Sequence, residues 1–255
     1  SGQIIREIGK VLVGKEAVVE KVLMTIYAGG HILLEDAPGV GKTTMALAFS
    51  KALGLEYKRV QFTPDTLPSD IIGFSTYDRE TGSLVYRSGA VMCHLFLGDE
   101  INRTSAKTQS ALLEAMEERN VTVDGVTHKL PYPFICIATQ NPLGFAGTQR
   151  LPESQLDRFM VRLSIGYPNT EEQIQILQRK MYQDPLENMQ KIIDRDDLLE
   201  IQNYLTSITV TKEILRYMTL LCEATRSDSR IELGVSPRGV IALLKMARAC
   251  AILRR

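Results

Sequence analysis

The sequence has little that would recruit nucleic acid, zinc or a membrane. Its 30 basic residues equal its 30 acidic ones, whereas a protein that holds nucleic acid through bulk charge usually has a basic excess. Its four cysteines are widely separated and form no CxxC pair, so no zinc site is predicted. No apolar run reaches 18 residues and no signal peptide is visible, so no membrane span is expected. Such sparse cysteines fit a reducing compartment, and a cytoplasmic location is expected.

Apolar runs alternate with helical patterns through the first two thirds of the chain. This alternation predicts a parallel sheet between helices, the α/β fold class. After Tyr167-Pro168 the pattern is almost entirely helical. We therefore expect an α/β core over residues 1–168 and a small helical lid over residues 169–255.

Local signals predict individual strands and turns. The apolar run 91–97 predicts a buried strand that contains Cys93, and a later apolar run contains Cys136. Both thiols are therefore expected to be small core residues. Asp124-Gly125, between alternating β-type residues, predicts a hairpin turn.

Helix starts are marked by capping residues. Thr104 is expected to cap a helix over about 105–118, and a capping box is expected to begin at Thr170. Ser236 can cap a later helix, with Pro237 in its first turn.

Residues 36–44, DAPGVGKTT, resemble the phosphate-binding loop GxxxxGK[ST]. In such a loop, backbone N–H groups and a helix N-terminus point at phosphate oxygens. The pattern predicts binding of ATP and Mg²⁺, with Lys42 on the β- and γ-phosphates and Thr43 on the metal. A Gly-rich turn without a ligand is the alternative, which the flanking apolar strand and Ala-rich helix argue against. The residues expected to contact the nucleotide are Pro38, Gly39, Val40, Gly41, Lys42, Thr43 and Thr44.

The loop departs from the pattern at Asp36, which stands where the first glycine is usual. A carboxylate ~8 Å from the phosphates would oppose binding by roughly 2 kcal/mol at an effective dielectric constant of 20. If the side chain points away, this cost vanishes. From the sequence alone, replacing Asp36 with glycine is expected to tighten ATP binding modestly or to change nothing.

A second acidic element follows an apolar strand in HLFLGDE, residues 94–100. This is the Walker B pattern, in which Asp99 would hold Mg²⁺ and Glu100 would orient or deprotonate the attacking water. Carboxyl ends of parallel strands share one edge of a sheet, so these acids can lie beside the phosphate loop. Asn141 ends the next apolar strand and could hold the water or the γ-phosphate. The alternative for all three is an ordinary turn residue. For Asn141, taken without its context, this alternative is favoured, because Pro142 follows.

Longer motifs make the chain similar to AAA+ ATPases of the MoxR family. These segments are FTPDTLPSDIIG (62–73), DEINRTSAKTQSALLEAMEERNVTV (99–123), ATQNP (138–142), LPESQLDRF (151–159) and GVSPRG (234–239). The resemblance covers nearly the whole chain. It implies a P-loop core with a five-stranded parallel sheet in the order 5-1-4-3-2 and a C-terminal helical lid.

The resemblance also implies roles for single residues. Asn141 matches the sensor 1 position, and Arg158 matches the arginine finger that acts on ATP bound by the neighbouring subunit. A salt bridge with Asp157 is the alternative for Arg158. Arg238 matches sensor 2, and whether it acts on its own or a neighbouring subunit's ATP is left open. Val13-Gly14 resembles the segment that packs against adenine.

Two predicted hairpins, at 73–90 and 120–130, match hairpins that face the central pore of related rings. Tyr77, Tyr86 and His128 are candidates for contact with a substrate or partner, or are ordinary exposed loop residues. Family members are usually longer after the sensor 2 helix, so either the sequence is cut there or its lid is short.

The favoured interpretation is a chaperone-like ATPase that hydrolyses ATP as a ring, with a hexamer implied. The resemblance implies remodelling or maturation of a client protein complex by cofactor or metal insertion, together with a partner that carries a von Willebrand factor A domain. The alternatives are a nucleic-acid motor and a nucleotide-dependent binding switch with little turnover. The balanced charge and the absence of Lys and Arg from the hairpin tip at 124–127 argue against the motor. The presence of Glu100, Asn141 and Arg158 argues against the switch.

Overall fold

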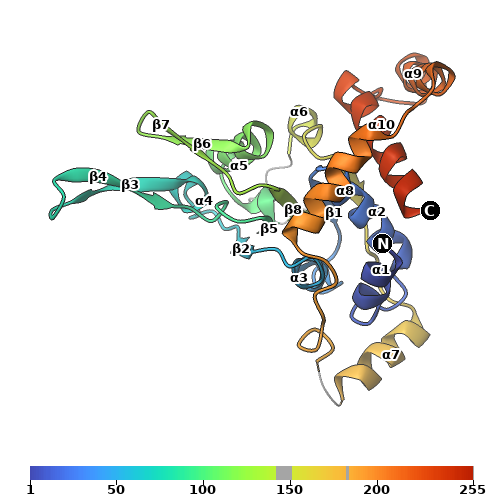
Figure 1. Cartoon of the computed structure of the whole chain (residues 1–255), viewed down its shortest axis with the longest axis horizontal. Coiled ribbons are helices and arrows are strands. Elements are labelled where there is room, and N and C mark those ends of the chain that lie inside the picture. The colour runs from blue at the N-terminus through green and yellow to red at the C-terminus, as the bar shows by residue number, and fades with distance from the viewer. Residues whose placement is uncertain (142–150, 182–183, 255) are drawn as a thin grey trace.

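A computed structural model describes residues 1–141, 151–181 and 184–254 (Figure 1). Its centre is a five-stranded sheet in the order β2-β5-β8-β1-β9, in which every neighbouring pair is parallel. Counted along the chain, this is the order 5-1-4-3-2, so the predicted fold is confirmed. The strands are β1 (Ile32–Glu35), β2 (Tyr57–Gln61), β5 (Leu95–Asp99), β8 (Ile135–Gln140) and β9 (Val161–Leu163).

Alternate residues of the central strands point to opposite faces of the sheet, and each face is covered by helices. On one face Ile32 and Leu34 pack with α1 (Gly2–Gly9), α2 (Glu16–Tyr27) and α3 (Lys42–Ala52). On the other face Leu33 packs in a second core that includes residues of α4 (Pro68–Ile72) and α5 (Ala106–Glu118). Both faces are thus buried, as expected for a parallel sheet.

The strand predicted over residues 91–97 was placed too early. The β5 strand starts at Leu95, opposite Tyr57 of β2, and the preceding residues form a local turn closed by Cys93 N–H on the Val91 carbonyl. The apolar residues before Leu95 suggested a strand, but they are apolar because they belong to the core: Val91 and Cys93 are fully buried without being part of a strand. Cys136, in β8, is also fully buried, so both cysteine predictions are confirmed.

Two predicted helix caps lie one residue away. Ser105, not Thr104, caps α5 by accepting from the backbone of Thr108, because the Thr104 hydroxyl instead donates to the Thr66 carbonyl. Asn169, not Thr170, opens the capping box of α7 (Thr170–Lys180). A short 3₁₀ turn, η1 (Ile101–Arg103), and a short helix, α6 (Glu153–Leu156), complete the core.

In the described part of the chain, four helices follow the core: α7, α8 (Arg195–Ser207), α9 (Lys212–Ser227) and α10 (Pro237–Leu253). Ser236 caps α10 as predicted, by accepting from the backbone of Gly239. Leu198, Leu205 and Ala249 of α8 and α10 belong to the same apolar core as α1 and α2. None of the described helices is long and apolar enough to cross a membrane.

Both predicted hairpins form and project from the same side of the core (Figure 1). They are β3 (Gly73–Asp78) with β4 (Ser83–Ser88) and β6 (Asn120–Val123) with β7 (Val126–Lys129). The rings of Tyr86 and His128 stack at 3.8 Å between centroids, and the Tyr86 hydroxyl donates to the Ile72 carbonyl. These two side chains therefore join the hairpins, whereas Tyr77 is 65% exposed.

His31 is a buried polar residue at the start of β1. Its Nδ1 accepts from the backbone N–H of Cys136 at 3.0 Å, so its Nε2–H faces the Met116 carbonyl at 3.1 Å. Burial lowers the pKa of His31 to about 4, while the bond to Met116 opposes the shift and the charge of Arg119 adds to it. The ring is therefore a neutral connector between the sheet and the end of α5.

Asp36 joins the ends of two neighbouring strands. It follows β1, and its carboxylate accepts from the Ser164 hydroxyl at 2.9 Å and from the N–H groups of Ile165 and Gly166, just after β9. Only 8% of the residue is exposed. The carboxylate therefore points to the end of β9, where it satisfies two backbone donors.

The stability of the fold is expected to decrease as pH is lowered, because of His31. The folded pKa lies below the ordinary value of 6.5, so unfolded chains take up a proton below pH 6.5 while the folded ring stays neutral to about pH 4. The contribution of neutral His31 to the free energy of unfolding is thus fully present above pH 6.5. It decreases by about 3 kcal/mol as pH falls from 6.5 to about 4. Urea unfolding from pH 7 to 4.5 should show a shallower decline for His31→Gln than for wild type. Equal slopes would contradict the assignment.

Replacement of Asp36 is expected to cost stability, apart from the small or absent effect on ATP binding expected from the loop pattern. Asp36→Gly removes the acceptor of two backbone N–H groups, and an unsatisfied buried donor costs about 1–3 kcal/mol. Asp36→Asn keeps one acceptor oxygen and should lose less. The midpoint of urea unfolding measures both, and an unchanged midpoint for Asp36→Gly would show that water replaces the carboxylate without cost.

Candidate functional site

A cavity of about 320 Å³ lies at the carboxyl ends of β1 and β5. The predicted loop residues and the predicted acidic pair line it together. Its lining residues are Pro38, Gly39, Gly41, Lys42, Thr43, Thr44, Arg59, Asp99 and Glu100. We call it the phosphate pocket, because it unites the two motifs that the sequence separates by more than 50 residues.

The loop turns into helix α3 at two glycines that adopt positive φ. Gly39 has φ 83° and Gly41 has φ 101°, conformations that other residues rarely adopt. Gly41 is the N-cap of α3, and no side-chain cap is formed there among the described residues. The first N–H groups of α3 are therefore open to an anion, which the helix dipole also favours.

Lys42 occupies the loop from inside. Its Nζ donates to the carbonyls of Asp36 at 2.7 Å and Ala37 at 3.1 Å. Burial lowers the pKa of Lys42, and the negative charges of Asp99, Asp36 and Glu100 oppose that shift. The ammonium is thus held next to the phosphate pocket by neutral acceptors that a phosphate oxygen can replace.

Three unpredicted side chains hold the acidic pair. The Thr139 hydroxyl donates to Asp99 Oδ1 at 2.6 Å and accepts the Glu100 N–H at 2.9 Å. Arg59 forms an ion pair with Asp99 Oδ2 at 2.7 Å. Gln61 donates to Glu100 Oε2 at 2.9 Å. Glu100 itself has φ 57°, a conformation rare in residues other than glycine, so its backbone is held in a strained turn.

One sequence signal could have revealed two of these residues. Arg59 and Gln61 alternate on β2 and stand near its carboxyl end, opposite Leu97 and Asp99 of β5. Polar side chains at that end of a strand that adjoins a Walker B strand point to the ligand edge of the sheet. Glu100 also accepts from Arg103 at 2.8 Å, so its carboxylate is held by two donors.

Asn141 lies at the same edge of the sheet, directly after β8. It is 7% exposed, and its carbonyl accepts from the Asn102 side chain at 3.3 Å. The structure thus brings Asn141 to the edge that carries Asp99 and Glu100, although it does not line the phosphate pocket. Its sensor role stays a prediction.

The oxygen ligands in the phosphate pocket fit a magnesium ion that arrives with a nucleotide. Thr43 and Asp99 both line the pocket, and their hydroxyl and carboxylate oxygens are the hard ligands that Mg²⁺ prefers. Among the described residues no group of three or more His, Cys, Asp or Glu side chains could hold a metal ion. Protein groups this few suit Mg²⁺ that is also coordinated by phosphates.

A second cavity, of about 370 Å³, adjoins the phosphate loop. Val13, Val40 and Tyr167 line it together with Gly39 and Gly41, and charged side chains such as Lys15 and Arg179 line it as well, so a space of mixed character continues from the phosphate end. Among the predicted adenine contacts, Val13 is in place and Gly14 is not part of the lining. Gly14 packs instead against the Glu172 side chain, which leaves no room for a Cβ atom.

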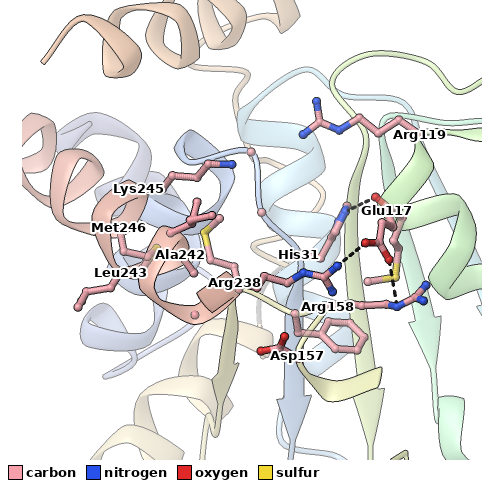
Figure 2. A pocket seen from close by; sticks show the side chains of 17 residues that line it. His31, Glu117, Arg119, Asp157, Arg158, Arg238, Ala242, Leu243, Lys245 and Met246 are labelled. Carbon is pink, nitrogen blue, oxygen red and sulfur yellow. Dashed lines mark hydrogen bonds and ion pairs between the residues drawn. The ribbon is translucent and has the colours of Figure 1, made fainter. Parts of the chain in front are cut away.

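A third cavity, of about 460 Å³, holds the two arginines implied by the family resemblance (Figure 2). Arg158 Nε lies 3.3 Å from Glu117 Oε2, and Arg238 is paired with the other oxygen of the same carboxylate. Asp157 accepts from the Ser236 hydroxyl at 2.7 Å. The alternative Arg158–Asp157 salt bridge is therefore wrong in its partner, because Arg158 pairs with Glu117. We call this cavity the arginine pocket.

The arginine pocket and the phosphate pocket lie at opposite edges of the sheet. Arg158 precedes β9, and His31, which also lines the arginine pocket, precedes β1. Asp99 is the last residue of β5, and Lys42 follows the carboxyl end of β1. The two pockets share no lining residue. In one subunit, therefore, Arg158 and Arg238 are grouped with each other and not with the phosphate loop.

Comparison with known proteins agrees with this arrangement. Residues 31–161 match the family model described as ATPase family associated with various cellular activities (AAA), and residues 223–255 match an AAA lid domain. The chain is 46% identical to the uncharacterised protein YeaC of Bacillus subtilis over 252 residues, 99% of this chain and 79% of the relative. It is 37% identical to Chaperone MoxR1 of Mycobacterium tuberculosis over 257 residues, 97% of this chain and 68% of the relative.

A solved structure gives the same result. The crystal structure of a protein described as an ATPase from Cytophaga hutchinsonii superposes with a TM-score of 0.89 at 38% identity, covering 99% of this chain and 79% of that one. The MoxR protein of Paracoccus denitrificans is 30% identical over 94% of this chain. With an AAA core, an AAA lid and relatives of this kind over almost its full length, the chain belongs to the MoxR family of AAA+ ATPases.

Proposed function

We propose that the chain hydrolyses ATP with Mg²⁺ at sites shared between neighbouring subunits of a ring. One subunit supplies the phosphate loop, Asp99, Glu100 and Asn141, and the next supplies Arg158 and Arg238. The observation that carries the proposal is the separation of the arginine pocket from the phosphate pocket at opposite edges of one parallel sheet. Two arginines that lie at the edge of the sheet opposite to their own phosphate loop are suited to complete the loop of a neighbour.

Each group then has a chemical role. Lys42 and the N–H groups of α3 bind phosphate oxygens, and Thr43 and Asp99 hold the Mg²⁺, which neutralises phosphate charge. Glu100, fixed by Gln61 and Arg103, orients or deprotonates the attacking water. Arg158 stabilises the charge that develops on the transferred phosphoryl group, a contribution worth ~10³–10⁵ in rate. Arg238 of the same neighbour adds a second positive charge.

The biological role follows from the family rather than from the site. We infer a chaperone-like ring, implied to be a hexamer, that remodels or matures a client protein complex by cofactor or metal insertion. One relative is named a chaperone. A protein with a von Willebrand factor A domain is the expected partner, and the joined hairpins, with Tyr77 exposed, offer a projecting surface for the client.

The first test is steady-state ATPase activity across protein concentration for wild type, Glu100→Gln and Arg158→Ala. Specific activity should rise with concentration, because a site is complete only after assembly. Both variants should lose at least about 10³ in kcat while they still bind ATP, and chelation of Mg²⁺ should abolish turnover. Activity that is independent of concentration, with Arg158→Ala unchanged, would contradict shared sites and favour a nucleotide-dependent switch or a self-contained site.

Nucleic acid provides the control for the competing class of function. Single- and double-stranded DNA added to the same assay should leave kcat unchanged, since the tip of the β6–β7 hairpin carries Asp124-Gly125-Val126-Thr127 and no basic residue. A DNA-dependent rise in kcat that is lost at high salt would instead support a nucleic-acid motor.

A further inference from the structure

Glu117 is the one carboxylate that pairs with both arginines of the arginine pocket, among the residues that the structure describes (Figure 2). We propose that Glu117 is a positioning residue, which holds Arg158 and Arg238 as a pair and so presents both to a neighbouring subunit's nucleotide. The inference rests on the shared-site function proposed above and adds a residue to it.

The geometry of the two ion pairs leaves each arginine able to bind phosphate. Glu117 contacts Arg158 through Nε, at the inner end of the guanidinium, and contacts Arg238 through one terminal nitrogen. A guanidinium has five N–H donors in a rigid fork. Glu117 therefore fixes the direction of each fork without using all of its donors, and Figure 2 shows the terminal nitrogens of Arg158 directed away from the carboxylate.

The charge in the arginine pocket also suits a positioning role. Four cations line it, Arg119, Arg158, Arg238 and Lys245, against two carboxylates, Glu117 and Asp157. Asp157 accepts from Ser236, which leaves Glu117 as the acid for the two arginines. The described lining stays positive after both pairs have formed, so a phosphate is still attracted.

Stability alone does not account for this arrangement. The side chains of Arg158, Glu117 and Arg238 are 30%, 36% and 46% exposed, and ion pairs this open to solvent contribute little to stability. They are, in contrast, accessible to a neighbouring chain. Fixing the rotamers of two long side chains before assembly reduces the entropy lost when they meet a nucleotide.

Glu117 also connects the two elements that carry the arginines. It lies in the last turn of α5, Arg158 lies in the loop before β9, and Arg238 lies in the first turn of α10. The Ser236 hydroxyl, at the start of α10, donates to Asp157 next to Arg158. The contacts Ser236–Asp157 and Arg238–Glu117 thus tie the start of α10 to the core. Glu117 is the residue that binds both arginines.

The direct test compares Glu117→Gln with Glu114→Gln, which removes the same charge one turn earlier on α5. Glu114 is exposed and lines a small cavity with Arg158, but it forms no ion pair with a residue that the structure describes, so it controls for the loss of a nearby charge. Glu117→Gln should lower kcat about tenfold with KM for ATP within about twofold, since the phosphate loop is untouched. Glu114→Gln should match wild type. Thermal unfolding of both variants should also match wild type, which separates positioning from misfolding.

A mixing experiment tests whether Glu117 acts across the subunit boundary. Glu100→Gln subunits, which cannot hydrolyse ATP but have intact arginines, should restore activity to Arg158→Ala subunits. Glu100→Gln/Glu117→Gln subunits should restore about tenfold less. In addition, Glu117→Gln added to Arg158→Ala/Arg238→Ala should be no slower than Arg158→Ala/Arg238→Ala alone, because a positioning residue acts only through the two arginines.

The outcomes separate this inference from the proposed function. If Glu100→Gln subunits fail to rescue Arg158→Ala subunits, shared sites are wrong, and this inference is wrong with them. If rescue succeeds and Glu117 makes no difference to it, the shared sites stand and the positioning role is overturned. A rise in kcat for Glu117→Gln would overturn it as well, because Glu117 would then restrain the arginines. A loss that multiplies with that of Arg158→Ala/Arg238→Ala would also overturn it, because Glu117 would then act without either arginine.

Discussion

All five strands of the central sheet run in one direction, and this constraint decides which residues can meet. Parallel strands joined by helices place every carboxyl end at one edge of the sheet. Asp36, Asp99 and Asn141 lie at the carboxyl ends of three different strands, and they therefore share that edge. Residues that precede strands gather at the opposite edge, as His31 and Arg158 do. The division into a phosphate pocket and an arginine pocket is therefore a property of the topology.

The charged groups at both edges are already satisfied by partners within the chain. Lys42 donates to loop carbonyls, Asp99 pairs with Arg59, and Glu117 pairs with the two arginines. Buried or partly buried charges without partners would be costly. A bound nucleotide must therefore replace these contacts within the chain, because the charged groups are not simply hydrated before it binds.

The sequence predicted the fold and the phosphate pocket because their signals are local and ordered along the chain. The loop at 36–44 and the acids at Asp99 and Glu100 could be located from short motifs, and the alternation of strands and helices implied the shared edge. The sheet order itself came from the family resemblance. A motif could not show where the Asp36 carboxylate points, since its partners lie almost 130 residues away.

Side chains that act through tertiary contacts escaped prediction for the same reason. Arg59 and Gln61 belong to no motif, and Thr139 lies in the segment ATQNP without a role of its own, although each contacts Asp99 or Glu100. Glu117 lies within a quoted segment but was not singled out, because its partners come from the loop before β9 and from α10. The two misplaced caps had a different cause. Neighbouring residues such as Thr104 and Ser105 can both cap a helix, and only the packing against Thr66 selects between them.

The helices after the core contact both edges of the sheet, which makes them the physical link between the two pockets. Gly166, held by Asp36, leads to Tyr167 and Pro168 in the wall of the second cavity beside the phosphate loop. At the other end of this segment, α10 carries Arg238 into the arginine pocket. Between them α8 and α10 share one apolar core with α2. A close-packed core resists displacement of its parts, and α7 contributes no buried residue to it, so the packing of α8 and α10 against α2 is what holds Arg238 at the arginine pocket.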